Sequence, residues 1–323
     1  SIQAFFLVQA GFGLLQAIML HTLARRVVGE RDAPYDFADL RRVWKFSAWM
    51  SGIAITSLVF TQLDKALLSR FIDLESFGHY MLAVLLVSGL QVVIGPAFNV
   101  IYPKFTTLHA RGDGATLARF YSDTSRMFAA AVFSLALALA LHVEAIVTLW
   151  TGQGDVAVRV APLVALLAVG SALNGIMYFP YALQLASGRP RIPFAINLAL
   201  LLLAAPTIVW LAMHYGAIGG AMSWALLGVV YLVVGTTMTG RKIAHFAGAR
   251  WLARDIAVPL VLALLPALAG AWLSNVLRAS PWIETGIAVL AACFGIAAGA
   301  LYSPFARQQL LVLLGAKARS CPS

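Results

Sequence analysis

Long apolar runs alternate with short polar stretches along the whole 323-residue chain. A helix that crosses the hydrocarbon core of a bilayer, roughly 30 Å thick, needs about 20 residues. The pattern therefore predicts nine membrane-spanning helices, near residues 2–24, 43–63, 78–101, 127–149, 160–186, 192–214, 217–239, 255–275 and 282–302.

Composition supports this interpretation. Hydrophobic residues make up 61% of the chain and charged residues only 11%, whereas soluble domains are about a quarter charged. Too few polar residues are present to cover a water-soluble surface, so the predicted fold class is an all-α polytopic membrane helix bundle. Cys293 and Cys321 form neither a disulfide framework nor a metal-ligand spacing.

Basic residues are distributed unevenly between alternate loops. Nineteen of the 23 lie in the stretches 25–45, 102–126, 187–191, 240–254 and 303–323, and four lie in 64–77, 150–159, 215–216 and 276–281. Because cytoplasmic loops are enriched in Lys and Arg, the first set is predicted to be cytoplasmic. The net charge of +10 then indicates this bias and attraction to anionic lipids, and not nucleic-acid binding.

Polar residues recur at helical spacing in several of the apolar segments. In lipid, such faces turn toward other helices or a cavity. One interpretation is close helix packing with inter-helix hydrogen bonds, and the other is a shared polar cavity. The uncharged cavity candidates are Gln9, Gln16, Thr61, Gln91, Asn99, Asn174, Tyr178, Tyr181 and Gln184.

Charge meets long apolar stretches at residues 61–80, which we predict to form the outer turn of a hairpin. Lys65 falls on the Thr61 face of the helix, and Asp64 points about 100° away. The charged cavity candidates are Lys65, Arg70 and Asp64. Lys65 and Arg70 could contact an anionic group, although Lys65 could equally extend to the interface while Asp64 caps or pairs locally. The candidates for a cytoplasmic entrance are Lys104, Arg119 and Arg126.

The sequence contains no Walker motif, HExxH, GxSxG or CxxC. Asp73 and Glu75 form an isolated D-x-E in an outer loop, a weak match to the acidic metal site of membrane glycosyltransferases. We therefore expect no enzymatic activity, no cofactor and no metal site, and keep a polytopic glycosyltransferase or ligase as an alternative.

Several stretches together resemble a known family. They are TQLDKALLSRFIDLESFGHYMLA from Thr61, PAFNVIYPKFTTLHARGDGATLARFY from Pro96, LWTGQGDVAVRVAPLVALLAVGSALNGIMYFPYALQLASG from Leu149, and YGAIGGAMSW from Tyr215. They resemble the bacterial oligosaccharide (O-antigen type) flippases of the multidrug/oligosaccharidyl-lipid/polysaccharide exporter superfamily. The likeness covers most of residues 40–235 and is a whole-pattern match without a catalytic signature.

The resemblance implies a particular division of the chain. Such transporters have two six-helix lobes, often followed by two further helices. Residues 1–24 would be the last helix of an N-terminal lobe whose five other helices lie upstream. The remaining parts would be a cytoplasmic linker at 25–45, a C-terminal lobe at 43–240, a basic cytoplasmic loop at 241–254, two additional helices at 255–302, and a cytoplasmic amphipathic tail at 303–323.

The resemblance also implies a function. The expected activity is translocation of undecaprenyl-pyrophosphate-linked oligosaccharides across the bacterial inner membrane by alternating access, for surface polysaccharide synthesis. Expected partners are this lipid-linked oligosaccharide, anionic membrane lipids and polysaccharide polymerase machinery. A cation-coupled multidrug exporter of the same superfamily is the alternative. It should have a buried acid in mid-helix, and we expect the acids Asp64, Glu144, Asp255 and Glu284 to lie near segment ends.

Overall fold

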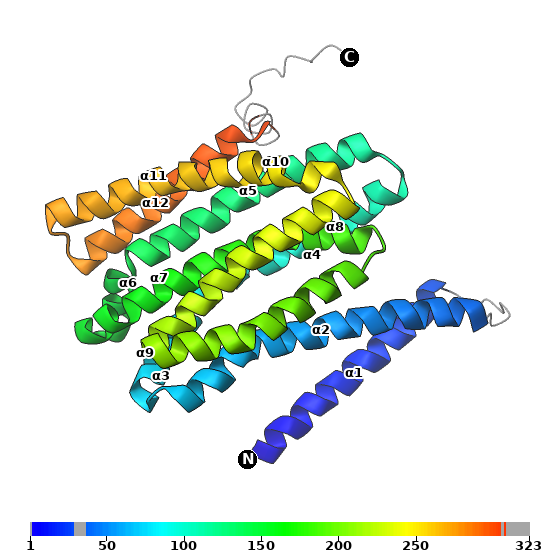
Figure 1. The fold of residues 1–323 in the computed structure, drawn as a ribbon, viewed down its shortest axis with the longest axis horizontal. Helices are drawn as coiled ribbons and strands as arrows, with labels where there is room; N and C mark the ends of the chain where they lie inside the picture. The colour runs from blue at the N-terminus through cyan, green and yellow to red at the C-terminus, as the bar shows by residue number, and fades with distance from the viewer. Residues whose placement is uncertain (1, 29–36, 305–306, 308–323) are drawn as a thin grey trace, which may run out of the picture. The chain divides into compact units, whose positions relative to one another are not determined.

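The computed structural model describes residues 2–28, 37–304 and 307 of the chain (Figure 1). These residues form helices joined by short turns, and none of them lies in a strand. The predicted all-α fold class is therefore confirmed. The chain divides into two units, residues 1–47 and 48–323.

The first unit consists of α1 (Ile2–Val28) and the first turns of α2 (Phe37–Phe71), which continues into the second unit. Large apolar side chains of α1, such as Leu7, Phe12 and Leu14, are exposed. A helix that is apolar on all sides suits a lipid environment. Arg25 and Arg26 lie in the last turn of α1, at the end that the charge distribution predicts to be cytoplasmic.

The second unit contains the rest of α2 and all later helices. In chain order these are α3 (Leu74–Ser88), α4 (Gln91–Ala110), α5 (Gly114–Leu141), α6 (Val143–Thr151), α7 (Gly154–Ile176), α8 (Tyr178–Ala186), α9 (Arg191–Lys242), η1 (His245–Ala247), α10 (Ala249–Trp251), η2 (Leu252–Ile256), α11 (Ala257–Leu277) and α12 (Pro281–Tyr302). Helix η2 is a short π-helix.

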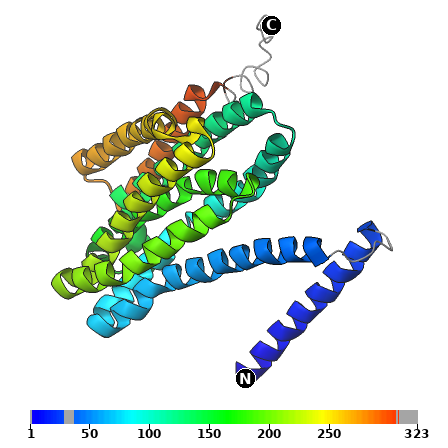
Figure 2. The same ribbon diagram turned by 45° about the vertical axis from the view of Figure 1, so that its right-hand side comes forward.

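Helix α9 is a hairpin of two arms. Its backbone reverses at Gly216, where φ is +59° and ψ is −136°, a conformation that glycine adopts without steric cost. Figure 2 shows the two arms running back along each other. They approach so closely that a Cβ on Gly219 would lie 2.0 Å from the carbonyl oxygen of Leu211. The arms correspond to the predicted segments 192–214 and 217–239.

The core of the second unit lies between α3, α4, α5, α7, α8 and the second arm of α9. Glycines allow the closest approach. A Cβ on Gly170 of α7 would lie 2.5 Å from Cδ1 of Trp224 in the second arm of α9. A separate apolar cluster, including Ile196, Leu200 and Ile208, joins the first arm of α9 to Leu63 and Leu67 of α2.

Helices α11 and α12 form a second hairpin, which packs on α5 (Figure 1). Small residues meet at this contact, as expected for helices that associate in lipid. A Cβ on Gly299 would lie 2.0 Å from Cβ of Ala130, for example. Two side-chain contacts flank this packing. Arg126 of α5 forms an ion pair with Asp255 of η2, just before α11, and Nδ1 of His142, directly after α5, lies 3.4 Å from Oε1 of Glu284 in α12.

Among the described residues, seven helices are long and apolar enough to cross a membrane, or eight if α3 and α4, which meet at a 43° bend, form one broken span. The 52-residue α9 is counted once in this total. Counting its two arms separately raises eight to the nine segments that the sequence predicts. Helices of this number, length and composition are typical of a multi-pass membrane protein.

Several predicted loops are shorter in the structure than in the sequence analysis. The predicted outer turn 64–77 is wrong in its extent, because α2 continues to Phe71 and α3 begins at Leu74. The charges of Asp64 and Lys65 are accommodated within the helix by the contacts described below. Asp113 caps α5, and its side chain accepts a hydrogen bond from the backbone N–H of Thr116 at 3.0 Å.

The predicted domain boundaries remain predictions. Most of the cytoplasmic tail at 303–323 lies outside the described residues, as does part of the linker at 25–45. Of that linker, residues 37–45 belong to α2.

Candidate binding groove

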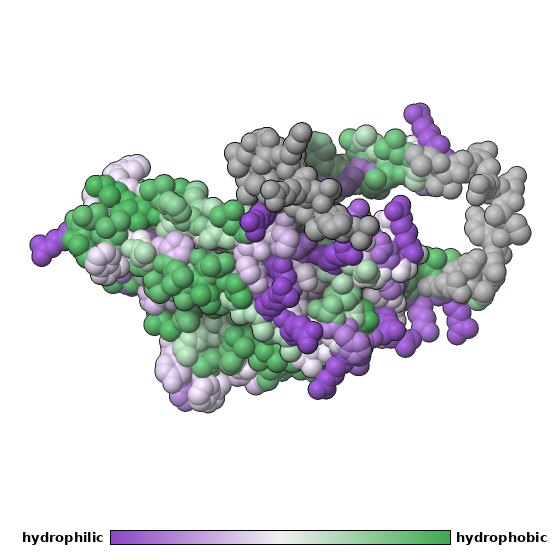
Figure 3. All heavy atoms as spheres, turned by 90° about the horizontal axis from the view of Figure 1, so that it is seen from above, coloured by the Kyte–Doolittle hydropathy of each residue, from purple (hydrophilic) through white to green (hydrophobic). Residues whose placement is uncertain are grey.

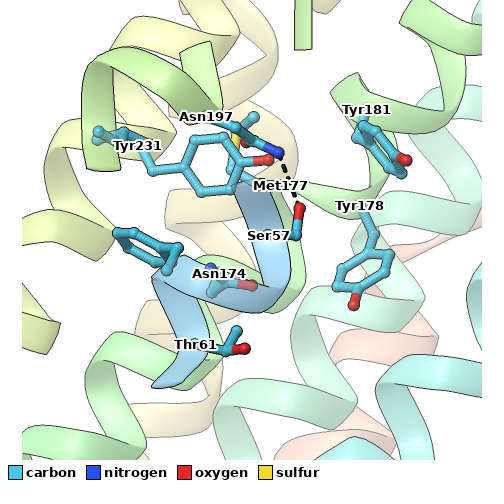
Figure 4. Close-up of a pocket in the computed structure, with 10 residues that line it drawn as sticks. Ser57, Thr61, Asn174, Met177, Tyr178, Tyr181, Asn197 and Tyr231 are labelled. Carbon is cyan, nitrogen blue, oxygen red and sulfur yellow. Dashed lines mark hydrogen bonds between the residues drawn. The ribbon is translucent and has the colours of Figure 1, made fainter. Parts of the chain in front are cut away.

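A cavity of about 300 Å³ lies between α2, α7, α8 and the two arms of α9 (Figure 4). Tyr178 and Tyr181 of α8 stand on one side of it, and Asn197 and Tyr231 of α9 on the other. The lining residues are Ser57, Phe60, Thr61, Asn174, Met177, Tyr178, Tyr181, Asn197, Leu200 and Tyr231.

Aromatic rings and amides dominate this cavity. The Asn197 Nδ2 donates a hydrogen bond to Ser57 Oγ at 2.9 Å, which ties the first arm of α9 to α2. Tyr178 and Tyr181 both pack against Phe98 of α4, with ring centroids 5.5 Å apart in each pair. Their positions are thus fixed by α4, while their phenol groups remain partly exposed.

A second cavity of about 140 Å³ adjoins the first at Thr61, which lines both. Its lining residues are Thr61, Asp64, Lys65, Val84, Val87, Ser88, Gln91, Leu167, Ser171 and Trp224. Ser57, Thr61 and Lys65 follow one another at intervals of four, so they share one face of α2 over about 12 Å. We call the two cavities together the α2 groove.

Lys65 provides the basic group of the α2 groove; of the described lining residues, no other is basic. Its Nζ donates to the carbonyl oxygen of Thr61 at 2.6 Å and lies 3.4 Å from Oδ1 of Asp64. The Asp64 side chain is only 7% exposed and its Oδ2 accepts a hydrogen bond from the Tyr80 hydroxyl at 2.6 Å. One oxygen of Asp64 thus faces Lys65 and the other is held by α3.

The structure brings seven predicted cavity residues to the α2 groove. They are Thr61, Asp64, Lys65, Gln91, Asn174, Tyr178 and Tyr181. They come from four different helices, so the polar stripes converge on shared space here. Whether they bind a substrate remains a prediction.

The other predicted cavity residues lie elsewhere. Arg70 and Asn99 are exposed and line neither cavity. Gln184 is buried and donates from Nε2 to Thr239 Oγ1 at 2.7 Å, which is the helix-packing role that the sequence left open. Gln9 and Gln16 are exposed on α1, in the first unit.

The three entrance candidates differ from one another. Lys104 and Arg119 are exposed on α4 and α5. Arg126 is buried, with its Nε 2.7 Å from Oδ1 of Asp255, and a further distance of 3.6 Å joins its Nη1 to Oδ1 of Asp123. Its guanidinium group is therefore already neutralised by carboxylates, and it lies outside the α2 groove.

Sequence analysis missed the groove residues of α9, chiefly Asn197 and Tyr231, and the role of Tyr80. Asn197 and Tyr231 are isolated polar residues in strongly apolar segments, and such residues usually face a bundle interior, whereas Tyr80 directly follows His79. The sequence therefore indicates an inward-facing position for Asn197 and Tyr231. Neither residue belongs to a repeated polar stripe, so the search for stripes does not find them.

Asp73 and Glu75 each have a structural partner. Asp73 accepts a hydrogen bond from the backbone N–H of Ser76 at 2.9 Å, which caps α3 and lowers the pKa of the Asp73 carboxyl group. Glu75 forms an ion pair with Arg159 of α7. Within residues 2–28, 37–304 and 307, no three His, Cys, Asp or Glu side chains form a group that could hold a metal ion.

Residues 4–154, which include α2 and its Lys65, match the family model described as "Polysaccharide biosynthesis protein". The predicted resemblance to polysaccharide biosynthesis proteins is confirmed. The chain is also 23% identical over 202 residues to the teichuronic acid biosynthesis protein TuaB of Bacillus subtilis (strain 168). That alignment covers 62% of this chain and 41% of the relative, so the chain spans less than half of the relative's length. No solved structure matches this chain significantly.

Proposed function

We propose that this membrane protein of polysaccharide synthesis is part of a flippase. Its substrate would be a lipid-linked oligosaccharide, with undecaprenyl pyrophosphate as the carrier, moved across the bacterial inner membrane by alternating access. The observation that supports this most directly is the α2 groove, where aromatic and amide side chains lead to a single ammonium group.

The chemistry of the groove suits the two parts of such a substrate. Amides and phenols such as Asn174, Asn197 and Tyr231 can hydrogen-bond sugar hydroxyls, and aromatic faces can pack on sugar rings. Lys65 can bind a phosphate oxygen, because an ammonium group is a natural phosphate partner. The apolar tail of the substrate would remain in the surrounding lipid.

Asp64 would orient Lys65 in this scheme. Its carboxylate holds the lysine at 3.4 Å and is itself fixed by Tyr80. The partners of Lys65 are therefore local, and a phosphate could replace them. A partner that can be exchanged suits a transporter, since the substrate must also leave.

The test is a complementation experiment with the intact gene in a strain that lacks its own flippase. Surface polysaccharide and the lipid-linked precursor on the cytoplasmic face are measured for the wild type and for Lys65→Ala. Loss of a hydrogen bond to a charged group costs about 1.5–3 kcal/mol, so we expect the flux to fall on the order of tenfold or more.

The matched control is Arg70→Ala, which removes the same charge five residues along α2 but outside the groove. Its flux should stay near that of the wild type, and Lys65→Arg should restore part of the loss. Wild-type flux in Lys65→Ala, at equal protein abundance, would overturn the proposal.

One observation favours a second candidate function. We expected acids only near segment ends, yet Asp64 is buried two turns before the end of α2, beside the groove. A cation-coupled exporter of the same superfamily could use such a carboxylate. Extrusion of a cationic dye that depends on Asp64 and not on Lys65, with no effect on polysaccharide, would favour this alternative.

A further inference from the structure

A third cavity lies away from the α2 groove, at the end of the bundle where α5 begins. It measures about 590 Å³ and is lined by Ser122, Arg126, His245, Phe246, Arg250, Trp251, Arg254 and Asp255. The segment from η1 to η2 forms one wall and α5 the other. We call it the Arg250 pocket.

Positive charge in the Arg250 pocket is only partly compensated. Arg126 is paired with Asp255 and lies near Asp123. Arg250 and Arg254 are exposed, and across the described part of the chain no carboxylate forms an ion pair with either. Within the described residues, the pocket therefore has two guanidinium groups without a carboxylate partner, and His245 lines it as well.

The wall of the pocket is fixed by buried aromatic residues. The Trp251 indole N–H donates to Ser125 Oγ of α5 at 2.8 Å, and Trp251 is only 1% exposed. The ring of Tyr121 contacts both Trp251 and Phe246, with centroids 5.3 and 5.5 Å apart. The π-helix η2 then carries the chain from Trp251 into α11 and places Arg254 over the same pocket as Arg250.

A pocket of this kind suits a ligand that is anionic at one end and apolar at the other. Guanidinium groups bind phosphate oxygens in a bidentate manner, and the aromatic residues Phe246 and Trp251 line the same pocket. Figure 3 shows hydrophilic side chains lying directly beside an apolar band on one face of the molecule. Basic pockets between membrane helices on the cytoplasmic side are typical sites for anionic lipid headgroups.

We propose that the Arg250 pocket binds the phosphate-ester headgroup of an anionic phospholipid, with Arg250 and Arg254 on the phosphate. The occupant would be a resident lipid of the leaflet that faces the predicted cytoplasmic side. This site would tie the α11–α12 hairpin to the membrane surface at the point where it joins α5. The proposal is independent of whether the α2 groove transports a saccharide.

Lipid binding can be measured with the purified intact protein by native mass spectrometry, with phosphatidylglycerol or phosphatidylcholine added. Each basic residue near an anionic surface contributes about fivefold to binding. Arg250→Gln/Arg254→Gln should therefore weaken phosphatidylglycerol binding roughly 25-fold and remove most of its preference over phosphatidylcholine. Arg250→Lys/Arg254→Lys should keep most of the preference.

The matched control is Arg111→Gln/Arg278→Gln, which removes two exposed positive charges outside the pocket and should keep the wild-type preference. A second arm adds water-soluble glycerol phosphate. If it competes fully with phosphatidylglycerol at equal concentration, the site recognises free phosphate and the lipid proposal fails. An unchanged preference in Arg250→Gln/Arg254→Gln, with an unchanged melting temperature, would also overturn it.

Discussion

Asp64 and Asp255 are both buried carboxylates paired with a basic residue, but their surroundings differ. Asp255 and its partner Arg126 are both buried, with side chains 5% and 10% exposed, and their atoms lie 2.7 Å apart. Asp64 is equally buried, but its partner Lys65 is 25% exposed and lies in the α2 groove at 3.4 Å. The Arg126–Asp255 pair, which we call the closed pair, is shielded from solvent. In the Asp64–Lys65 pair, which we call the open pair, the lysine ammonium group remains accessible from the α2 groove.

The same residue types thus stabilise the fold at Arg126 and, in the proposed function, would bind a ligand at Lys65. A buried arginine with two nearby carboxylates, as at Arg126, is held in place by its partners and also packs over the Tyr302 ring at 5.3 Å. A lysine held by one carboxylate and one carbonyl oxygen can exchange these partners for a ligand. The exposed fraction of the cation, and not the presence of an ion pair, separates the two cases.

The largest effect is expected for the closed pair. Asp255→Ala leaves the Arg126 guanidinium buried with only Asp123, at 3.6 Å. Removing one partner of a buried ion pair costs about 3–5 kcal/mol, because the remaining charge is no longer compensated. We expect a correspondingly lower free energy of unfolding, measured by chemical denaturation in detergent.

The control for this prediction is the double variant Arg126→Met/Asp255→Leu. Replacing both members of a buried pair by apolar residues is often neutral, so this variant should recover most of the lost stability. If Asp255→Ala unfolds like the wild type, the pair is solvated in the protein, and the contrast with Asp64 disappears.

A smaller effect is expected at the open pair. Tyr80→Phe removes the hydroxyl group that donates to Asp64 Oδ2 at 2.6 Å and keeps the ring in its buried position. A hydrogen bond to a charged group contributes about 1.5–3 kcal/mol. We expect a loss of stability in this range, and a lower flux in the complementation assay because Asp64 no longer holds Lys65 in place.

Tyr215→Phe is the control, because Tyr215 is exposed at the turn of α9. It should change neither stability nor flux. A loss of stability in Tyr80→Phe without a loss of flux would show that Tyr80 supports the fold alone. Asp64 and Lys65 would then be a purely structural ion pair, as Asp255 and Arg126 are.

The helices could be predicted from sequence because apolar runs and the distribution of Lys and Arg are read directly from the chain. Their ends were less predictable. Asp64 and Lys65 suggested a loop, but the hydroxyl group of Tyr80, 16 residues away, allows this carboxylate to remain within α2. A contact of this kind depends on how α2 and α3 pack, which no local pattern contains.

The existence of the groove could be predicted from sequence, but only some of its lining residues could. Polar stripes on separate helices indicated a shared cavity, and Thr61, Asn174 and Tyr178 indeed line one. The stripes could not distinguish Gln184, whose amide is buried against Thr239, from Asn174, which faces the cavity. Nor could they show that Arg126 is neutralised by Asp255, which lies 129 residues further along the chain.

The smallest effect concerns carboxylates that are neither buried nor paired with a base. Asp73 and Asp113 accept hydrogen bonds from the backbone N–H groups of Ser76 and Thr116, and these bonds lower the pKa of both carboxyl groups below the ordinary 3.8. Their stabilising contribution is therefore complete above that value and is lost as the pH falls through the lower folded-state pKa.

Asn also caps helices but does not titrate. Asp73→Asn/Asp113→Asn should thus match the wild type near neutral pH and lose less thermal stability on acidification from about pH 5 to about pH 2. Parallel curves for the two proteins would mean that neither cap contributes, and that the acid sensitivity of this fold comes from its buried pairs.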